Sequence, residues 1–488
     1  MLLGAAVLAG TLLYLGSFAF DYGAPFRRHD PLVVTDNARL APTRVAAVDR
    51  LETVEALQAA LANARAKGLK VSIAGSHHSQ GGQTYTAGGV QFDMRGFRKV
   101  LAIDTVAQTI TVESGATWDE VQRALAPVGL AIKVMQSSNI FTVGGTMSAN
   151  AHGRDLDVTQ VVEVVERFHL LKADGEVVEV SRTENPELFS LVIGGYGMYG
   201  VILDVTLKVT RDELYVQRAV SMDYTAFPAY FADSIRADSN VVLMLVRPSI
   251  DPDPDRFLRE IVVVTWEHAA KGTPGSMALT EEAHVARDRF FLSISRRFEW
   301  ARKLRWWLQK RVELGAGAVR VVSRNNAMRP PLAPLELLRY ESSKNTDIIQ
   351  EYYVPTRNFV RFMDRFREIL LDSDMNVMSS TVRYVSPNAT PVLAYAPTEP
   401  VFAVIQMSNV GLDSTSQAKA AAVTGQLVDA AIYYGGTYYL TYQLYPSATQ
   451  LYQAYPRAGE AFERKRFYDP AETFSSKFYE RYGHAKAQ

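Results

Sequence analysis

The sequence contains no cysteine, and its charges cancel. Across 488 residues, 52 Lys and Arg balance 52 Asp and Glu, so the formal net charge is zero. The absence of cysteine excludes disulfides, iron–sulfur clusters and thiolate catalysis. The balanced charge gives no bulk field that would attract nucleic acid. Because the chain is too long for one compact core, at least two domains are expected.

Charge is also missing from the N-terminal run MLLGAAVLAGTLLYLGSFAF, residues 1–20. An apolar helix of this length spans about 30 Å, roughly the core of a bilayer. The first positive charges, Arg27 and Arg28, follow the run, whereas a cleaved signal peptide usually begins with Lys or Arg. We therefore expect a membrane anchor over residues 1–22, with the remainder in the cytoplasm by the positive-inside tendency. A cleaved signal and a buried helix are the alternatives.

Hydrophobic periodicity in the first half predicts alternating helices and strands, and hence an α+β domain that ends near residue 212. Thr117 and Glu120 have the spacing of a helix capping box, and Asp174-Gly175 is a typical hairpin turn. Helices are predicted over residues 51–68, 118–129 and 185–195. Strands or hairpins are predicted over residues 69–75, 88–94, 100–116, 161–181 and 200–210.

Glycine gathers in loops between these elements, where backbone N–H groups can converge on phosphate oxygens. Gly195, Gly197 and Gly200 match the dinucleotide pattern G-x-G-x-x-G, but they follow a predicted helix and precede a strand. Because the dinucleotide motif has the opposite order, a Rossmann fold is rejected. A further glycine-rich loop, AGSHHSQGGQ, holds two of only eight histidines, His77 and His78.

Four stretches of the sequence form an ordered set: IAGSHHSQGGQTYTAGGVQFDM, SGATWDEVQRAL, TVGGTMSANAHG and LFSLVIGGYGMYGVI. They occur in the order seen in PCMH-type FAD-binding oxidoreductases of the vanillyl-alcohol oxidase family, which the chain resembles over residues 40–212. The segment YPRAGEAFERKRFYDPAETFSSKF, residues 455–478, is similar to the closing segment of decaprenylphosphoryl-ribose oxidase, and aldonolactone and alditol oxidases are also close in motifs.

The resemblance implies an α+β fold with three parts beyond the N-terminal apolar helix. A two-subdomain PCMH-type FAD-binding domain would occupy residues 35–212. An antiparallel-sheet cap domain that binds the substrate would follow over residues 213–445. Residues 446–488 would then return to the first domain.

The resemblance also implies FAD, joined covalently through His78. This residue is the third after Gly75 and precedes Ser79, as in relatives with covalent flavin, although the polyprenyl-sugar oxidase has tyrosine here. A neutral imidazole held close to the flavin methyl group is a competent nucleophile; the alternative is a polar loop residue. Neighbours on an extended segment point to opposite sides, so His77 is expected to face away.

The residues expected to contact FAD come from the glycine-rich loops, one following strand and one tyrosine near the C-terminus. They are Ala74, Gly75, Ser76, His77, His78, Ser79, Gln83, Thr142, Val143, Gly144, Gly145, Ala149, Asn150, His152, Gly153, Val201, Ile202 and Tyr439.

Oxidation of an alcohol needs a hydride acceptor, a group that takes the hydroxyl proton and side chains that orient the carbon. The stretch IIQEYYVP resembles the family strand that faces the flavin, which places Glu351 at the substrate; a surface carboxylate is the alternative. Arg383 is expected to orient a polar substrate or to form an ordinary salt bridge. His152 is expected either in the pocket or as a hydrogen bonder that pins its loop.

Tyr442 falls where the polyprenyl-sugar oxidase has its catalytic lysine, by the spacing between Gly-Gly and Tyr-Pro-Arg. A phenol, with an ordinary pKa near 10, would serve as a base only when strongly perturbed. The lysine-to-tyrosine change puts an identical substrate in doubt, and core packing is the alternative for these dense tyrosines.

Residues 287–313, RDRFFLSISRRFEWARKLRWWLQKRVE, interleave aromatic with basic side chains. Such a helix suits the headgroup boundary of a membrane; the alternative is an amphipathic helix whose aromatics reach the core. Together with the N-terminal run, this segment predicts membrane lipid as a partner and a small-molecule or lipid-linked substrate.

The resemblance therefore implies a membrane-associated FAD enzyme without a metal. It would oxidise a CH–OH group of a sugar, polyol, lactone or lipid-linked sugar by hydride transfer to flavin N5, with dioxygen or a membrane quinone as electron acceptor. A flavin-dependent reductase of a C=C bond and a non-catalytic flavoprotein subunit are the alternatives.

Overall fold

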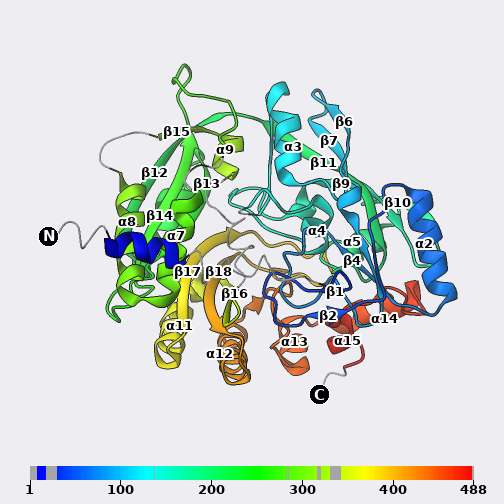
Figure 1. Ribbon diagram of the computed structural model, residues 1–488. Helices are drawn as coiled ribbons and strands as arrows, with labels where there is room; N and C mark the ends of the chain where they lie inside the picture. The colour runs from blue at the N-terminus through cyan, green and yellow to red at the C-terminus, as the bar shows by residue number, and fades with distance from the viewer. Residues whose placement is uncertain are drawn as a thin grey trace.

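The computed structural model describes residues 8–17, 30–136, 138–281, 283, 285–315, 320–329 and 342–485. Two α+β halves lie side by side, the N-terminal half on the right of Figure 1 and the half in green to orange on the left. The functional site lies where they meet, so each half is described by what it contributes there.

The first half begins with a small parallel sheet of strand order β3-β5-β4. The helix α2 connects β3 to β4 and buries Leu57, Leu61 and Ala64, the apolar positions spaced for one helical face. The strand β4 is largely buried, and the histidine loop follows it directly, so the loop begins in the core. The elements are β1 (Val33–Val34), β2 (Thr43–Arg44), β3 (Ala47–Asp49), α2 (Val54–Ala66), β4 (Val71–Ala74) and β5 (Val90–Asp93).

A second, antiparallel sheet of order β10-β9-β11-β7-β6 completes this half, with β8 paired to β11. The capping box predicted at Thr117 and Glu120 is present, and Gly175 takes φ 94° in the predicted hairpin turn. The elements are β6 (Val100–Asp104), β7 (Thr109–Glu113), α3 (Trp118–Leu125), β8 (Leu130–Ile132), α4 (Val143–Ser148), β9 (Val165–Leu171), β10 (Val177–Ser181), α5 (Pro186–Val192) and β11 (Val201–Arg211).

The short strands β1, β2, β3 and β8 and the helix α4 of this half were not predicted from the sequence. The short strand β8 was missed because its three residues follow a helical pattern directly. The helix α4 lies within TVGGTMSANAHG, which we read as a loop because of its paired glycines. Thr142 caps this helix by accepting a hydrogen bond from the Gly145 N–H, and such a cap offsets the poor helix propensity of glycine.

The second half is built on an eight-stranded sheet of order β15-β12-β14-β13-β17-β18-β16-β19. All its strand pairs are antiparallel. The elements are β12 (Leu214–Asp223), α6 (Phe227–Tyr230), β13 (Val241–Pro248), β14 (Glu260–His268), α7 (Val285–Arg297), α8 (Glu299–Leu314), β15 (Arg320–Ser323), α9 (Arg324–Met328), β16 (Asn345–Pro355), α11 (Phe359–Ser373), β17 (Asn376–Val385), β18 (Val401–Gly411), α12 (Ser414–Tyr433) and β19 (Thr437–Tyr438).

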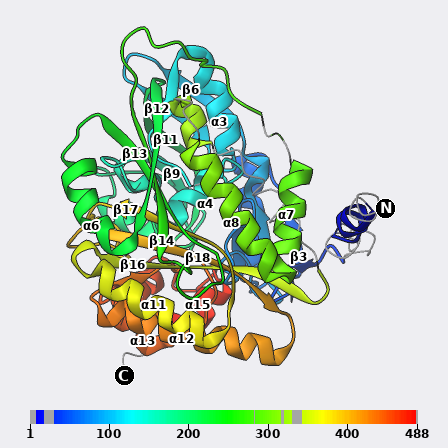
Figure 2. The same cartoon turned by 90° about the vertical axis from the view of Figure 1, so that its left-hand side faces the viewer.

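The two faces of this sheet have different neighbours. Even-numbered residues of β16 and β18 face the aromatic core on α6 and α11: Tyr352 packs on Phe366, and Phe402 packs on Phe227 and Phe359. Since successive side chains of a strand alternate, the odd-numbered residues face the opposite way. The helices α7 and α8 pack on other parts of the sheet, α7 against β17 and α8 against β12 and β14, and Figure 2 shows them above α11 and α12.

The C-terminal segment packs against the first half of the chain. Phe474 forms a parallel bridge with Val71 of β4, and the Lys477 N–H donates to Gly82 O of the histidine loop at 3.1 Å. The elements are α13 (Ala448–Ala454), α14 (Ala458–Tyr468) and α15 (Lys477–Tyr482). The C-terminal segment therefore contacts both the strand that precedes the histidine loop and the end of that loop.

The expected anchor over residues 1–22 lies largely outside the described residues. Residues 8–17 are helical, and Tyr14 of this helix contacts Phe290 of α7 with ring centroids 5.5 Å apart. Among the described residues, no helix is both long and apolar enough to cross a membrane.

Candidate functional site

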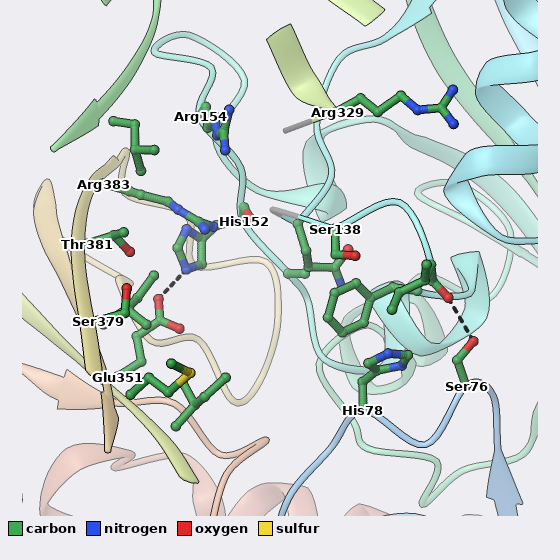
Figure 3. A pocket seen from close by; sticks show the side chains of 18 of the residues that line it. Ser76, His78, Ser138, His152, Arg154, Arg329, Glu351, Ser379, Thr381 and Arg383 are labelled. Carbon is green, nitrogen blue, oxygen red and sulfur yellow. Dashed lines mark hydrogen bonds and ion pairs between the residues drawn. The ribbon is translucent and has the colours of Figure 1, made fainter. Parts of the chain in front are cut away.

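A cavity of about 1170 Å³ lies between the two halves. One wall consists of the histidine loop and the α4 segment, and the other mainly of odd-numbered residues of the cap sheet (Figure 3). The residues from the cap strands are Gln217, Leu245, Arg247, Val264, Trp266, Arg320, Val321, Val322, Asp347, Ile349, Glu351, Ser379, Ser380, Thr381, Arg383, Ile405 and Met407. Strands β13, β16, β17 and β18 present mainly odd positions and β14 even ones, as antiparallel register requires for one shared face.

The histidine loop forms the first wall. Two contacts fix it to the rest of the site: Gln80 N donates to Thr441 O at 2.9 Å, and Gln80 Oε1 accepts from the Ile349 N–H of β16 at 2.7 Å. Ser76 Oγ donates to Ile140 O at 3.0 Å, which links the loop to the segment before α4. The loop is thus bound to the cap strand that carries Glu351.

His78 borders the cavity, and its ring lies 4.2 Å from that of Phe141 between centroids. Neither of its nitrogens has a hydrogen-bond partner among the described residues. Burial, reinforced by the neighbouring His77, lowers the pKa of His78 to about 3. The imidazole is therefore neutral at physiological pH, the form in which a ring nitrogen is nucleophilic.

The expectation that His77 would face away from the cavity is wrong. His77 takes φ 57°, so the loop is not extended there and the alternation of an extended segment does not apply. Both imidazoles line the cavity. Burial, together with the charge of Arg95, lowers the pKa of His77 to about 4.

Close packing of the loop on α4 requires glycine. A side chain at Gly75 would place Cβ 2.1 Å from Thr142 Oγ1, and one at Gly144 would place Cβ 2.8 Å from Ser114 Cβ. Both glycines line the cavity. They allow two backbone segments to approach each other and to present bare main chain to a ligand.

Glu351 is the centre of a buried polar cluster on the second wall. Its Oε1 contacts His152 Nε2 and its Oε2 accepts from the Tyr442 hydroxyl at 3.3 Å, while Arg383 NH1 donates to His152 O at 3.4 Å. Figure 3 shows His152 and Glu351 pointing toward each other, with Arg383 beside them. Glu351 and His152 are 2% exposed, so this carboxylate is not a surface group.

The ring of His152 is held by tyrosines. Its centroid lies 5.6 Å from that of Tyr353 and 6.2 Å from that of Tyr439. The Tyr439 hydroxyl donates to Ala149 O at 2.9 Å, which ties this tyrosine to the glycine loop that carries His152. The packing orients His152 toward Glu351 and leaves its Nδ1 without a partner within the described parts of the chain.

Tyr442 is perturbed in the wrong direction for a base. Burial, with the negative charge of Glu351, raises the pKa of the Tyr442 phenol well above its ordinary value. The group therefore stays protonated and can donate a hydrogen bond but does not provide a phenolate. Burial also lowers the pKa of Arg383, an effect that the charge of Glu351 opposes.

The cavity brings together most of the residues singled out in the sequence. Those in its lining are Gly75, Ser76, His77, His78, Ser79, Gln83, Thr142, Gly144, Gly145, Ala149, His152, Ile202, Glu351, Arg383, Tyr439 and Tyr442. The others lie outside the lining: Ala74, Val143, Asn150, Gly153 and Val201.

The residues outside the lining have structural roles. Ala74, Val143 and Val201 are buried in the hydrophobic core, and Asn150 bonds Gln160 Oε1 at 2.8 Å and the Val162 N–H at 3.2 Å. A side chain at Gly153 would place Cβ 3.0 Å from Met135 O. Each neighbours a lining residue in sequence but turns to the opposite side.

Sequence reasoning missed several cavity residues, above all Arg154, Arg247, Ser379 and Thr381. The parity of the cap strands would have found the last three, because they share the odd positions of Glu351 and Arg383. Arg154 had no such signal, since it lies in an irregular segment after His152.

The lining fits FAD. Buried polar atoms with no hydrogen-bond partner in the described ranges gather on the first wall, among them Ser79 Oγ, Ser114 Oγ, Ser138 Oγ and both nitrogens of His78. A buried polar group without a partner is costly, so these atoms indicate a polar ligand. Backbone that is partly open at Gly75 and exposed at Gly145 suits phosphate oxygens, and neutral His78 beside Phe141 suits an aromatic ring.

Residues 45–181 match the family model described as FAD binding domain. An uncharacterised oxidoreductase of the fasciation locus of Rhodococcoides fascians is 29% identical over 252 residues, 51% of this chain and 52% of that protein. Decaprenylphosphoryl-β-D-ribose oxidase of Mycolicibacterium smegmatis is 30% identical over 178 residues, 36% and 38% of the two chains. L-gulonolactone oxidase of Mus musculus is 32% identical over 148 residues, 30% and 33% of the two chains.

These alignments span about half or less of each relative. They confirm the resemblance and the cofactor predicted from the sequence, and they leave the activity of the whole protein to be proposed. Residues 45–181 are similar to the FAD binding domain family, and FAD is the cofactor of this protein.

Proposed function

We propose that the protein is an FAD-dependent oxidoreductase that oxidises a CH–OH group of a sugar, polyol, sugar lactone or lipid-linked sugar. One observation carries the proposal: the buried Glu351 cluster faces the FAD-binding loops across a single cavity. Two relatives named for their substrates, a decaprenylphosphoryl-ribose oxidase and an L-gulonolactone oxidase, support a sugar-derived substrate.

FAD, when bound, supplies the hydride acceptor. The protein must then take the hydroxyl proton and hold the carbon in place. The pair Glu351–His152 provides proton-accepting atoms in a water-poor site, and Tyr442 donates to the second carboxylate oxygen. Arg383 completes the cluster as a fixed positive charge beside the reacting oxygen. Electrons would pass onward to dioxygen or to a membrane quinone.

His78 would carry the covalent bond to FAD. The neutral state of its imidazole and its two unbonded nitrogens, within the residues that the structure describes, support this role. The alternative of a polar loop residue would require hydrogen bonds for those nitrogens. The packing of His78 on Phe141 fixes the imidazole plane at the cavity wall.

The proposed oxidation is tested by anaerobic bleaching of the flavin with a panel of sugars, polyols, sugar lactones and prenyl-linked sugars. Bleaching by one of these classes in the wild type, and its loss in Glu351→Gln, is the expected result. Bleaching by NADPH and by no alcohol would contradict the proposal and favour a reductase. A flavin that neither class of donor reduces would favour a non-catalytic flavoprotein.

We also propose that the outer face of α8 meets an anionic membrane surface. Trp300, Lys303, Leu304, Trp307 and Arg311 form one exposed stripe at helical spacing, and Trp300 and Trp307 are each 51% exposed. Exposed aromatic and basic side chains on one helix face are typical of the headgroup boundary.

The helix over residues 8–17 adds a second apolar surface. Leu8 and Leu12 are each 61% exposed and Leu15 is 58% exposed, and Tyr14 of this helix rests on α7. Figure 2 shows this helix beside α7, on the same side of the molecule. Two neighbouring helices would therefore meet one bilayer.

Co-sedimentation with vesicles tests membrane binding. Vesicles that contain phosphatidylglycerol should bind the protein, and Trp307→Ala should weaken that binding several-fold. Tyr433→Ala is the matched control, because this aromatic is 82% exposed at the end of α12, away from the stripe. Equal loss in both variants, or equal binding to zwitterionic vesicles, would contradict the proposal.

A further inference from the structure

The cavity continues beneath the cap sheet, and its lining there is strongly cationic. Among the described residues that line the whole cavity, seven arginines face four carboxylates. The arginines are Arg154, Arg247, Arg287, Arg305, Arg320, Arg329 and Arg383, and the carboxylates are Asp288, Glu313, Asp347 and Glu351. Asp347 is paired with buried Arg296, and Arg329 is paired with Asp119, with both partners outside the lining, so the excess of positive charge on the cavity surface is unchanged.

Among the arginines that line the cavity and have no carboxylate contact in the described structure, Arg154 is the most deeply buried. It is 6% exposed, its NH1 donates to Ala327 O at 2.8 Å, and its guanidinium lies 5.6 Å from the Trp266 ring centroid. Its Nε has no partner in the described part of the protein. A buried guanidinium held only by a carbonyl and an aromatic face retains unused donors.

Two further arginines share this region. Arg247 lies 3.1 Å from Glu313 of α8, and Arg383 reaches the backbone of His152. Burial lowers the pKa of Arg154 to about 9, and the charges of Arg383 and Arg247 add to that effect while Glu313 opposes it. Arg247 pairs with Glu313, and Arg383 lies within the field of Glu351. Arg154 has no carboxylate contact among the described residues, so its charge lacks a counterion there.

We propose that this region is an oxyanion subsite in which Arg154, with Arg247 and Arg383, binds a phosphate or carboxylate group carried by the substrate. The inference rests on the proposed function and narrows it to anionic CH–OH compounds. An oxyanion would satisfy the free donors of Arg154 and the charge of all three side chains. Arg383 contacts the backbone of His152, so an anion bound there would place the adjoining carbon next to the Glu351 cluster.

The walls around the three arginines favour an anion with an apolar or sugar neighbour. Trp266, Leu245 and Val264 line the same part of the sheet. Such walls exclude water and strengthen each charge interaction. They also give the subsite a built-in reporter, because Trp266 lies directly against the Arg154 guanidinium.

Isothermal calorimetry of the FAD-loaded protein with inorganic phosphate and with acetate tests the subsite. Phosphate or acetate should bind the wild type, and Arg154→Gln should weaken binding about tenfold or more, since charged bidentate contacts are lost. Arg218→Gln is the matched control: it removes the same charge from the exposed face of β12, where Arg218 pairs with Glu267. Binding that is equal in wild type and Arg154→Gln would overturn the proposal.

A second variant keeps the test decisive if Arg154→Gln folds poorly. Glu313→Gln removes the carboxylate beside Arg247, so anion binding should tighten several-fold, a gain that misfolding does not produce. Unchanged or weaker anion binding in folded Glu313→Gln would count against the subsite. Flavin absorbance is recorded for each variant, because loss of FAD from Arg154→Gln would assign Arg154 to the cofactor and overturn the proposal.

Kinetics then identify the source of the anion. A phosphorylated or carboxylated sugar should show a lower KM than its neutral parent, and Arg154→Gln should erase that difference in KM. A prenyl phosphate in detergent, compared with a soluble sugar phosphate, distinguishes a lipid-linked from a soluble substrate. Anion binding is measured without turnover. A flavin that no alcohol reduces would therefore contradict the proposed oxidation, whereas Arg154-dependent anion binding would still support the subsite.

Discussion

The two walls of the cavity are built by different means. The FAD-binding wall uses loops, bare backbone and two imidazoles that burial keeps neutral. The cap wall uses regular strands whose side chains on one face carry the charged groups. A loop can wrap a large cofactor along its length, whereas a strand fixes a side chain in position to within its register. In the proposed function, the first wall binds the cofactor, and Glu351 of the second wall handles the proton together with His152 from the first half.

The largest effect is expected from removing the carboxylate of the cap wall. Glu351→Gln keeps the shape of the side chain but removes the proton-accepting carboxylate, so the rate of flavin reduction should fall by about 10²- to 10⁴-fold. Stopped-flow measurement under anaerobic conditions reports this step directly. Tyr352→Phe is the control, since Tyr352 lies on the opposite face of β16, packed on α11. A comparable fall in Tyr352→Phe would show that the strand, and not the carboxylate, matters.

The next effect concerns the loop wall. His78→Ala should abolish covalent flavin, so the acid-precipitated variant should be colourless while the wild type stays yellow. His77→Ala should keep its colour, because the neighbouring imidazole has no tethering role in the proposal. Yellow precipitates from both variants would place the covalent bond elsewhere.

A smaller effect separates hydrogen bonding from base catalysis at Tyr442. Because burial raises the pKa of the phenol, Tyr442→Phe removes one hydrogen bond to Glu351 and no base. The rate should fall by about three- to tenfold, the value of one such bond, and the shape of the pH–rate profile should persist. Disappearance of a limb of that profile in the variant would identify Tyr442 as a titrating catalytic group.

The smallest expected effect concerns the neutral state of His77, which is tested through the pH dependence of the free energy of unfolding. Unfolded His77 binds a proton near pH 6.5, whereas the folded pKa is about 4. The unfolded state therefore binds more protons between these values, and the free energy of unfolding falls as pH drops from 6.5 toward 4. His77→Asn should reduce the fall in the free energy of unfolding between pH 7 and pH 5 by roughly 1 kcal/mol, because His77 borders the cavity and is partly screened by solvent. Urea titrations at both pH values measure it, and identical losses would contradict the assignment.

Local chemistry was enough to predict most of the elements. The capping box at Thr117 and the turn at Gly175 were predicted and are present. The glycine-rich segment after Thr142 was read as a loop and is partly the helix α4, because a cap outweighed propensity. His77 was placed away from the cavity because an extended backbone was assumed, and one left-handed residue removed that assumption.

The sequence by itself determined the alternation of helices and strands, the glycine-rich loops with His78 among them, and the likeness to an FAD binding domain. These properties depend on neighbours within a few positions or on short motifs. The tertiary structure decided which distant side chains meet. Glu351 and His152 are 199 positions apart, and Arg154 joins the cap arginines only after the sheet has formed over it. Such contacts depend on strand order and on how the two halves pack, which local periodicity does not encode.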